Sequence, residues 1–309
     1  MTSLVEVSTY RPTPVSIADR QEAFGLTDTE LRRYTRGFGL SEIYWDESLS
    51  ETEILLAAAQ KLSLLRGRED RVRLVLRPRS VPSTAPYPAS PLHEVRRELA
   101  LPAAKTFALT ELGCAVGLLA IDVAGMLLAE EPDPDALALV LVGEKAFTRT
   151  NQVIDGMGIM GEGTAAVLVS AGGSRDRVLG FAARTESVGD SRLVVSDAVR
   201  DRFRDMYSDV LIDVIDRALT EAGMRTDDVD LVLPHNINRI SWEKLSPRLG
   251  IPVERIFLDN VPYTGHCFGA DPFINYATAR ELGRLRTGDR YLMVSVGLGA
   301  SFSAMVVEH

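Results

Sequence analysis

Apolar strands that alternate with helices restrict the fold of this 309-residue chain more than any other feature. Residues 137–142 (LALVLV) and 164–170 (TAAVLVS) are continuous apolar segments, and residues 291–296 form a third. Segments of this kind are typical of strands buried on both faces, in a sheet that helices cover on each side. The pattern therefore predicts an α/β fold with a mostly buried sheet.

Helices are predicted between these strands from apolar positions three and four residues apart. Ser50 and Glu53 form a capping-box signal at the start of a helix over residues 50–65. Further helices are predicted at 115–129, 205–222, 241–249 and 270–285, and further strands at 71–76, 105–110, 229–233, 255–258 and 301–307. Residues 77–91 contain five prolines, which predicts a long surface loop.

The two parts of the chain follow the same order of elements. Each ends with a helix, an apolar strand, a glycine-rich turn and another apolar strand. This order predicts an internal duplication, with one half at residues 1–170 and the other at 171–309.

Composition excludes several classes of function. The chain has 34 Lys and Arg against 43 Asp and Glu, a net charge of -9, so a nucleic-acid partner is not expected. No apolar run reaches the roughly 18 residues of a membrane helix. Two cysteines exclude a disulfide framework and a thiol-rich zinc site. With no signal-peptide pattern at the start, a cytoplasmic protein without a metal site is expected.

Only two cysteines and four histidines are available for thiol or imidazole chemistry. Cys114 lies between Gly113 and Ala115, where a predicted strand meets a helix, and a helix N-terminus favours the thiolate. The alternative is a buried cysteine that packs as a small hydrophobic residue. Cys267 lacks the helix-start setting and is the weaker candidate.

Two histidines stand out from the four. His235 follows the predicted strand at 229–233, and ligands of open α/β sheets bind at the carboxyl ends of strands. The alternative is a packed histidine bonded to a backbone carbonyl. His266 lies in a loop with Gly265 before it and Gly269 after it. His93 and His309 are expected at the surface or at a helix start.

The order of these motifs resembles the β-ketoacyl-ACP synthase III family of the thiolase superfamily. The likeness extends from about Thr27 to the end and is strongest at 161–169, 233–238 and 265–307. It implies the thiolase fold, in which two similar α-β-α-β-α halves form a five-layered α-β-α-β-α core. It also implies a homodimer with a site between the two halves of each chain.

The resemblance also implies roles for individual residues. Cys114 matches the nucleophile that takes an acyl group from a thioester, and His235 matches the family's catalytic histidine. The backbone amides of Cys114 and Gly299 would form the oxyanion hole. No permanently bound cofactor is implied, because the substrate is the acyl-phosphopantetheine of acyl carrier protein or coenzyme A.

One departure concerns the reaction. His266 stands where decarboxylating members of the family have asparagine, so it either replaces the amide as an enolate donor or acts as a base on a hydroxyl or amine. We favour the second interpretation, an acyltransferase of a natural-product pathway with a small-molecule acceptor. The alternatives are a decarboxylating synthase that uses malonyl-ACP, and a catalytically silent partner that binds a carrier protein.

A second departure concerns the carrier. The tryptophan that stacks on coenzyme A is missing near Leu31, whereas Arg32, Arg33 and Arg36 remain. This favours an acyl carrier protein as donor, bound by these arginines; the alternative is a solvated basic patch. Asn238 is a possible supporting residue. Asp271 is most simply the N-cap of a helix, and an aspartate that assists His266 is the lesser option.

Overall fold

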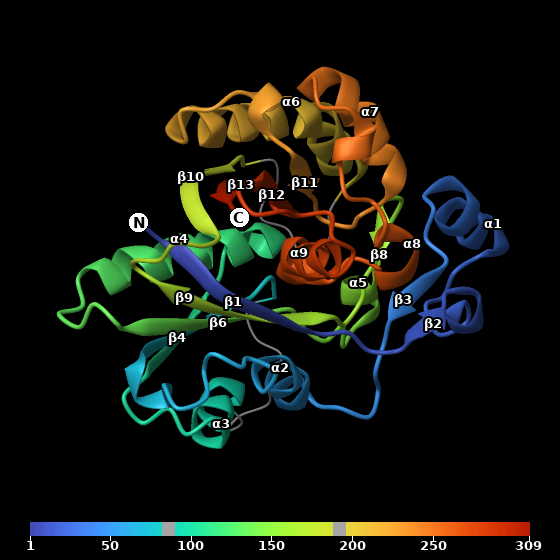
Figure 1. Cartoon of the computed structure of the whole chain (residues 1–309). Coiled ribbons are helices and arrows are strands. Elements are labelled where there is room, and N and C mark those ends of the chain that lie inside the picture. Colours follow the sequence, from blue (N-terminus) through green and yellow to red (C-terminus); the bar gives the residue numbers. More distant parts are fainter. Residues whose placement is uncertain (82–89, 188–195) are drawn as a thin grey trace.

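Helices and strands alternate in five layers through the molecule (Figure 1). The computed structural model describes residues 1–81, 90–187 and 196–309. Helices α6 and α7 cover β10 to β13, α4 and α9 fill the centre, and α2 and α3 cover the layer of β1, β4, β6 and β9 (Figure 1). The predicted α-β-α-β-α core is therefore present.

The first half of the chain supplies the lower layers in Figure 1 and helix α4 of the central layer. Its elements are β1 Ser3–Tyr10, β2 Pro14–Ser16, α1 Asp28–Arg32, β3 Glu42–Tyr44, α2 Glu51–Ala59, β4 Val72–Pro78, α3 Pro91–Glu98, β5 Lys105–Leu109, α4 Val116–Ala129, β6 Leu137–Val142, α5 Arg149–Gln152, β7 Val153–Ile154, β8 Gly158–Ile159 and β9 Thr164–Ser170. The second half has β10 Arg177–Thr185, α6 Asp197–Glu221, β11 Leu231–Leu233, α7 Arg239–Leu249, α8 Val261–Thr264, α9 Asp271–Glu281, β12 Arg290–Gly297 and β13 Ser301–Glu308.

The strand order repeats between the halves. In the first half it runs β1-β9-β6-β4-β5, with antiparallel, antiparallel, parallel and parallel pairings. In the second half it runs β10-β13-β12-β11, and these three pairings are again antiparallel, antiparallel and parallel. A single parallel bridge between Val232 and Ile256 lies where the fourth pairing would be. This repeat is what an internal duplication would produce; the division at residue 170 stays a prediction.

Most predicted elements are present, and β6 and β9 have the predicted bounds. Ser50 and Glu53 form the predicted capping box, but α2 ends at Ala59 instead of residue 65. Leu62 and Leu65 are buried in the turns that follow, and their burial explains why helical spacing continued past the helix end.

Two loop and strand predictions need correction. The strand predicted at 255–258 is wrong, because a 3₁₀ turn at Val253–Arg255 leaves only the single bridge of Ile256. The loop predicted at 77–91 is shorter, since Arg77 and Pro78 belong to β4 and α3 begins at Pro91. Residues 82–89 lie outside the described residues.

Burial of an arginine explains the extension of β4. The Arg77 guanidinium donates to Glu51 Oε1 at 2.9 Å and to the Leu141 carbonyl at 3.1 Å, and Arg77 is 1% exposed. A buried charge is tolerated only when it is paired in this way.

In the described ranges, with their two gaps, no helix has the length and apolarity to cross a membrane.

Candidate active site

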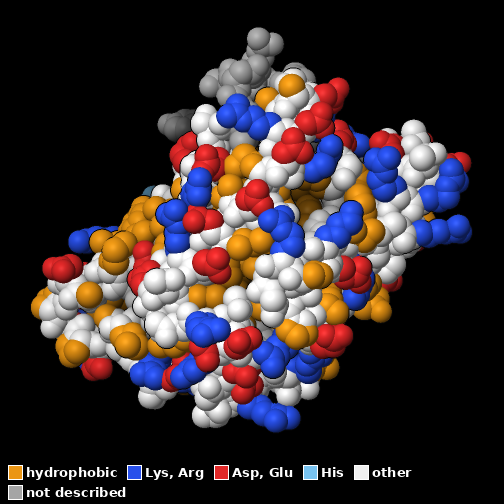
Figure 2. All heavy atoms as spheres, turned by 90° about the horizontal axis from the view of Figure 1, so that it is seen from above, with side chains coloured by type: hydrophobic (Ala, Val, Ile, Leu, Met, Phe, Trp, Pro, Cys, Tyr) orange, Lys and Arg blue, Asp and Glu red, His pale blue; other side chains and the backbone are white. Residues whose placement is uncertain are grey.

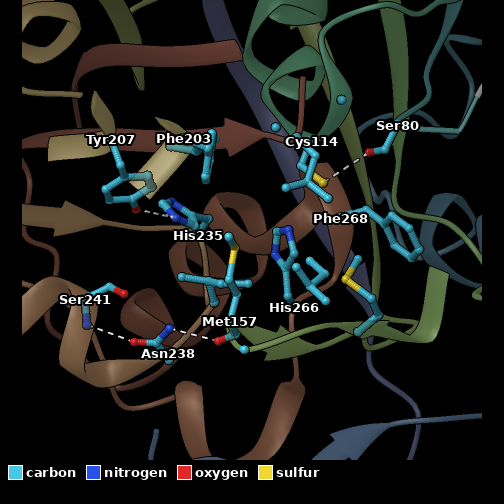
Figure 3. Close-up of a pocket in the computed structure, with 18 of the residues that line it drawn as sticks. Ser80, Cys114, Met157, Phe203, Tyr207, His235, Asn238, Ser241, His266 and Phe268 are labelled. Atoms are coloured by element: carbon cyan, nitrogen blue, oxygen red, sulfur yellow. Dashed lines mark hydrogen bonds between the residues drawn. The ribbon is translucent and has the colours of Figure 1, made fainter. Parts of the chain in front are cut away.

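A cavity of about 480 Å³ contains Cys114, His235 and His266 in its wall. On the face shown in Figure 2, hydrophobic side chains line a hollow with Lys and Arg side chains nearby. The close-up in Figure 3 shows the sulfur of Cys114 and the rings of both histidines turned toward the same space. The structure thus brings together the three residues that the sequence singled out.

The backbone of Cys114 is held by strands from the second half of the chain. Cys114 lies in the 3₁₀ turn Gly113–Ala115, which leads directly into α4. Ser295 on β12 donates to the Cys114 carbonyl at 2.8 Å, and Ser303 on β13 donates to the Ala115 carbonyl at 3.0 Å. The thiol therefore lies at the amino end of a helix, 7% exposed, where the helix dipole stabilises negative charge.

His266 lies between Cys114 and a buried carboxylate. Its Nδ1 is 2.5 Å from Asp271 Oδ2, and Asp271 also accepts hydrogen bonds from the amides of Cys267 at 2.7 Å and Asn236 at 2.5 Å. Asp271 is 0% exposed. The predicted N-cap role of Asp271 is wrong: Ala270 occupies the N-cap position of α9, because the carboxylate is turned toward His266 and these amides.

Electrostatics keep His266 charged. Burial alone would lower its pKa, but the negative charges of Asp271 and the Cys114 sulfur, and hydrogen bonds to both, raise the pKa to about 10. A sulfur, an imidazole and a carboxylate in this order form the arrangement in which a nucleophile is activated by a base that a third group orients.

His235 has a different environment. Its Nε2 is 3.0 Å from the hydroxyl of Tyr207 on α6, and Nδ1 is buried near the Val294 backbone without a well-formed hydrogen bond. Burial, and then the charge of His266, lower the pKa of His235 to about 3. His235 is therefore a neutral imidazole whose Nε2 is already engaged.

The Asn238 side chain forms hydrogen bonds with backbone groups of two separate segments. Its side-chain oxygen accepts from the Ser241 amide at 2.8 Å as the N-cap of α7, and its Nδ2 donates to the Met157 carbonyl at 2.9 Å (Figure 3). Both ends of the amide are used, so Asn238 fixes two walls of the cavity.

The glycine turn between β12 and β13 packs directly on the Cys114 turn. A Cβ on Gly297 would lie 2.3 Å from the Leu112 carbonyl oxygen and 2.7 Å from the Cys114 amide nitrogen. A Cβ on Gly113 would lie 3.2 Å from the Leu298 amide nitrogen. Gly297 and Leu298 line the cavity, whereas Gly299 is exposed at the turn.

The remaining candidates lie away from the sulfur. Arg32, Arg33 and Arg36 are exposed on α1 and on the π-helical turn that follows it. Arg33 approaches Gly156, a residue of the cavity wall. Cys267 is fully buried against Gly163, and burial raises its pKa well above the ordinary value.

Sequence reasoning missed Ser80 and Tyr207. Ser80 donates to the Cys114 sulfur at 3.4 Å (Figure 3). Its own amide donates to the buried Glu144 carboxylate at 2.5 Å. Ser80 lies in a serine- and proline-rich segment with no pattern that marks it. Tyr207 is one aromatic residue in a long amphipathic helix, and only the fold places it beside His235.

Replacing Ser80 by alanine tests its contact with the sulfur. A hydrogen bond to a charged group stabilises it by roughly 1.5–3 kcal/mol, so we expect Ser80→Ala to slow iodoacetamide labelling of Cys114 by about tenfold. The measurement is the labelling rate at one fixed pH. Ser208→Ala, in the same cavity, is the matched control. An unchanged labelling rate in Ser80→Ala would show that the contact does not stabilise the thiolate.

Comparisons with known proteins show which sequences this chain resembles. Residues 219–309 match the family model described as 3-oxoacyl-[acyl-carrier-protein (ACP)] synthase III C terminal. The β-ketoacyl-[acyl-carrier-protein] synthase III of Roseiflexus castenholzii is 33% identical over 152 residues, which cover 49% of this chain and 44% of the relative. That of Syntrophomonas wolfei is 26% identical over 180 residues, 56% and 53% of the two chains. The matches thus span about half the length of these curated relatives.

Solved structures match over nearly the whole chain. The acyltransferase ChlB3 superposes with a TM-score of 0.86 at 20% identity, covering 99% of this chain and 97% of ChlB3. The 3-oxoacyl-[acyl-carrier-protein] synthase III of Aquifex aeolicus gives 0.82 at 20% identity and covers 100% of both chains. The chain therefore has the thiolase fold, and its sequence is similar to that of the β-ketoacyl-ACP synthase III family.

Proposed function

We propose that the protein is an acyltransferase that forms an acyl-Cys114 intermediate and passes the acyl group to a hydroxyl or amine. The observation that carries this proposal is the position of His266 between the Cys114 sulfur and the buried Asp271. An asparagine in place of His266 could donate a hydrogen bond, but it could not accept the proton of an acceptor.

The first half-reaction uses the ion pair of Cys114 and His266. The Cys114 thiolate attacks the carbonyl carbon of the donor thioester, and the tetrahedral intermediate collapses by breaking the bond to the carrier sulfur. The charged His266 gives its proton to that sulfur. The products are acyl-Cys114, a free carrier thiol and a neutral His266.

The second half-reaction returns the proton. Acylation removes the negative charge of Cys114, which is one of the causes that raise the pKa of His266. The neutral imidazole then takes the proton of the acceptor as its oxygen or nitrogen attacks the acyl carbon. Cys114 leaves as a thiolate beside the recharged His266, and the site is restored.

Backbone amides would bind the oxyanion in both half-reactions. The Cys114 amide is one donor, and the close contact of Gly113 with the Leu298 amide makes that group the second candidate beside Gly299. Two such donors stabilise a tetrahedral intermediate as its charge develops.

The occupied Nε2 of His235 disfavours the decarboxylating alternative. In the family that this chain resembles, the matching histidine handles a thioester oxygen or a proton, but Tyr207 already binds this nitrogen. The silent-partner alternative does not account for a complete sulfur, imidazole and carboxylate arrangement in an open cavity.

The carrier and the assembly follow from the same resemblance. Acyl carrier protein is the proposed donor, because exposed arginines at 32, 33 and 36 suit its acidic surface. We also propose a cytoplasmic homodimer in a natural-product pathway, with a site between halves 1–170 and 171–309 and no resident cofactor.

Mass spectrometry tests the proposed function directly. Acyl thioesters of acyl carrier protein, coenzyme A and free pantetheine are each incubated with the protein, and we expect an added acyl mass on the Cys114 peptide. Addition of amines or alcohols should release the adduct as an amide or ester. Absence of an adduct with every donor would favour the silent partner, and carbon dioxide released from malonyl-ACP would favour the synthase.

A further inference from the structure

We propose that Tyr207 is a positioning residue that removes His235 from proton transfer, so that His266 is the imidazole that serves both half-reactions. The proposal rests on the proposed function, since it concerns which group takes the acceptor's proton. It is drawn from the contact of the Tyr207 hydroxyl on α6 with one ring nitrogen of His235.

The Tyr207 ring is fixed in place by aromatic neighbours. Its centroid lies 5.8 Å from that of Phe203 and 6.0 Å from that of Phe302, both in edge contacts. The hydroxyl then lies 3.0 Å from His235 Nε2, and Figure 3 shows the two groups facing each other. Trp242 holds the opposite side of the residue by donating to the His235 carbonyl at 3.0 Å.

The direction of this hydrogen bond follows from the protonation of both groups. Burial raises the pKa of Tyr207, so the phenol keeps a proton that it can donate. A neutral imidazole carries one N–H, and because the ring also contacts the Val294 backbone, we assign the hydrogen to Nδ1 and the free electron pair to Nε2. That electron pair already accepts from Tyr207 and is not available to an acceptor's proton.

The two histidines are near enough for this division to matter. Their ring centroids are 6.1 Å apart, and both line the same cavity. Asp271 stabilises the charge that His266 gains on taking a proton, and among the described residues His235 has no such carboxylate partner. In the part of the chain that the structure describes, the other charged residues of the cavity wall are Arg204 on α6 and Lys244 on α7, and neither charge would favour a charged His235.

Nuclear magnetic resonance of ring nitrogens measures the first consequence. A hydrogen bond to the neutral form of histidine lowers its pKa, so Tyr207→Phe should raise the pKa of His235 by about one unit. It should also shift the Nε2 resonance, because the nitrogen loses its donor. Tyr263→Phe, on an exposed tyrosine, is the matched control and should change neither value.

Transfer from a preformed acyl-enzyme measures the second consequence. We expect His235→Asn to slow transfer to the acceptor by no more than about tenfold, because His235 moves no proton. In a His266→Ala background, adding Tyr207→Phe should raise the residual transfer rate by about tenfold, since His235 Nε2 becomes free to accept a proton.

The outcomes separate this proposal from the proposed function. Adduct formation on Cys114 of the unaltered protein supports the function whatever Tyr207 does. If the adduct forms but His235→Asn slows transfer as severely as His266→Ala, the role assigned to Tyr207 is wrong. An unchanged His235 pKa in Tyr207→Phe would overturn it as well.

Discussion

Replacement of Cys114 by alanine is expected to remove the acyl adduct and to lower transfer by about 10⁴-fold or more. Alanine has no atom that can form a thioester with the acyl group. The remaining rate would come from binding and from the backbone amides alone. Intact-mass measurement after incubation with acyl-ACP, and product formation over time, check both parts.

Cys267→Ala is the matched control for this result. The second cysteine is 0% exposed, and burial raises its pKa well above the ordinary value, so it stays a thiol away from the cavity wall. This variant should keep the adduct on Cys114 and transfer at close to the unaltered rate. An adduct that persists in Cys114→Ala and disappears in Cys267→Ala would reverse the assignment of the nucleophile.

The second large effect is expected at His266 and its carboxylate partner. His266→Ala removes the group that takes and gives the proton, and should slow transfer by about 10³- to 10⁴-fold. Asp271→Asn should slow it by a similar factor, because the amide does not stabilise the imidazolium and can reverse the ring's tautomer. Rates with a fixed donor and acceptor measure both variants, and Asp259→Asn, an exposed aspartate, is the control.

The pH dependence of stability distinguishes this pair from a passive contact. The folded pKa of His266, about 10, lies above the ordinary value of 6.5, so the pair contributes its full stability below pH 6.5. That contribution is lost as the pH rises from 6.5 through about 10. We expect Asp271→Asn to flatten the stability curve over this range in urea unfolding. A curve of unchanged slope would show that His266 is not charged in the folded protein.

Apolar strands were predictable because their burial requires little besides their own side chains. Strands β6 and β9 are buried at every residue, and their bounds match the prediction. Strand β1 was missed because Glu6 and the hydroxyl residues around it break the apolar run, although pairing with β9 holds it in the sheet. The end of β4 depends on the ion pair between Arg77 and Glu51, two residues far apart in the sequence.

The site was predictable in its centre and not in its surroundings. Cysteine and histidine are scarce in this chain, and Cys114, His235 and His266 stood out because they lie at a helix start, a strand end and a glycine-flanked loop. The cavity wall contains all three. The direction in which the Asp271 carboxylate turns depends on amides of two separate loops, which spacing does not reveal. Tyr207 reaches His235 only after α6 has packed across the sheet.

The glycine contact beside the nucleophile has a consequence for recombining this protein with its relatives. A Cβ on Gly113 would lie 3.0 Å from the Gly297 Cα, and one on Gly297 would lie 2.9 Å from the Gly113 Cα, so the two backbones meet without side chains between them. A chimera that joins either half to a foreign half will seat its cysteine correctly only when both parents carry glycine at this seam. The two halves are thus constrained to evolve together at a point where neither contributes a functional group.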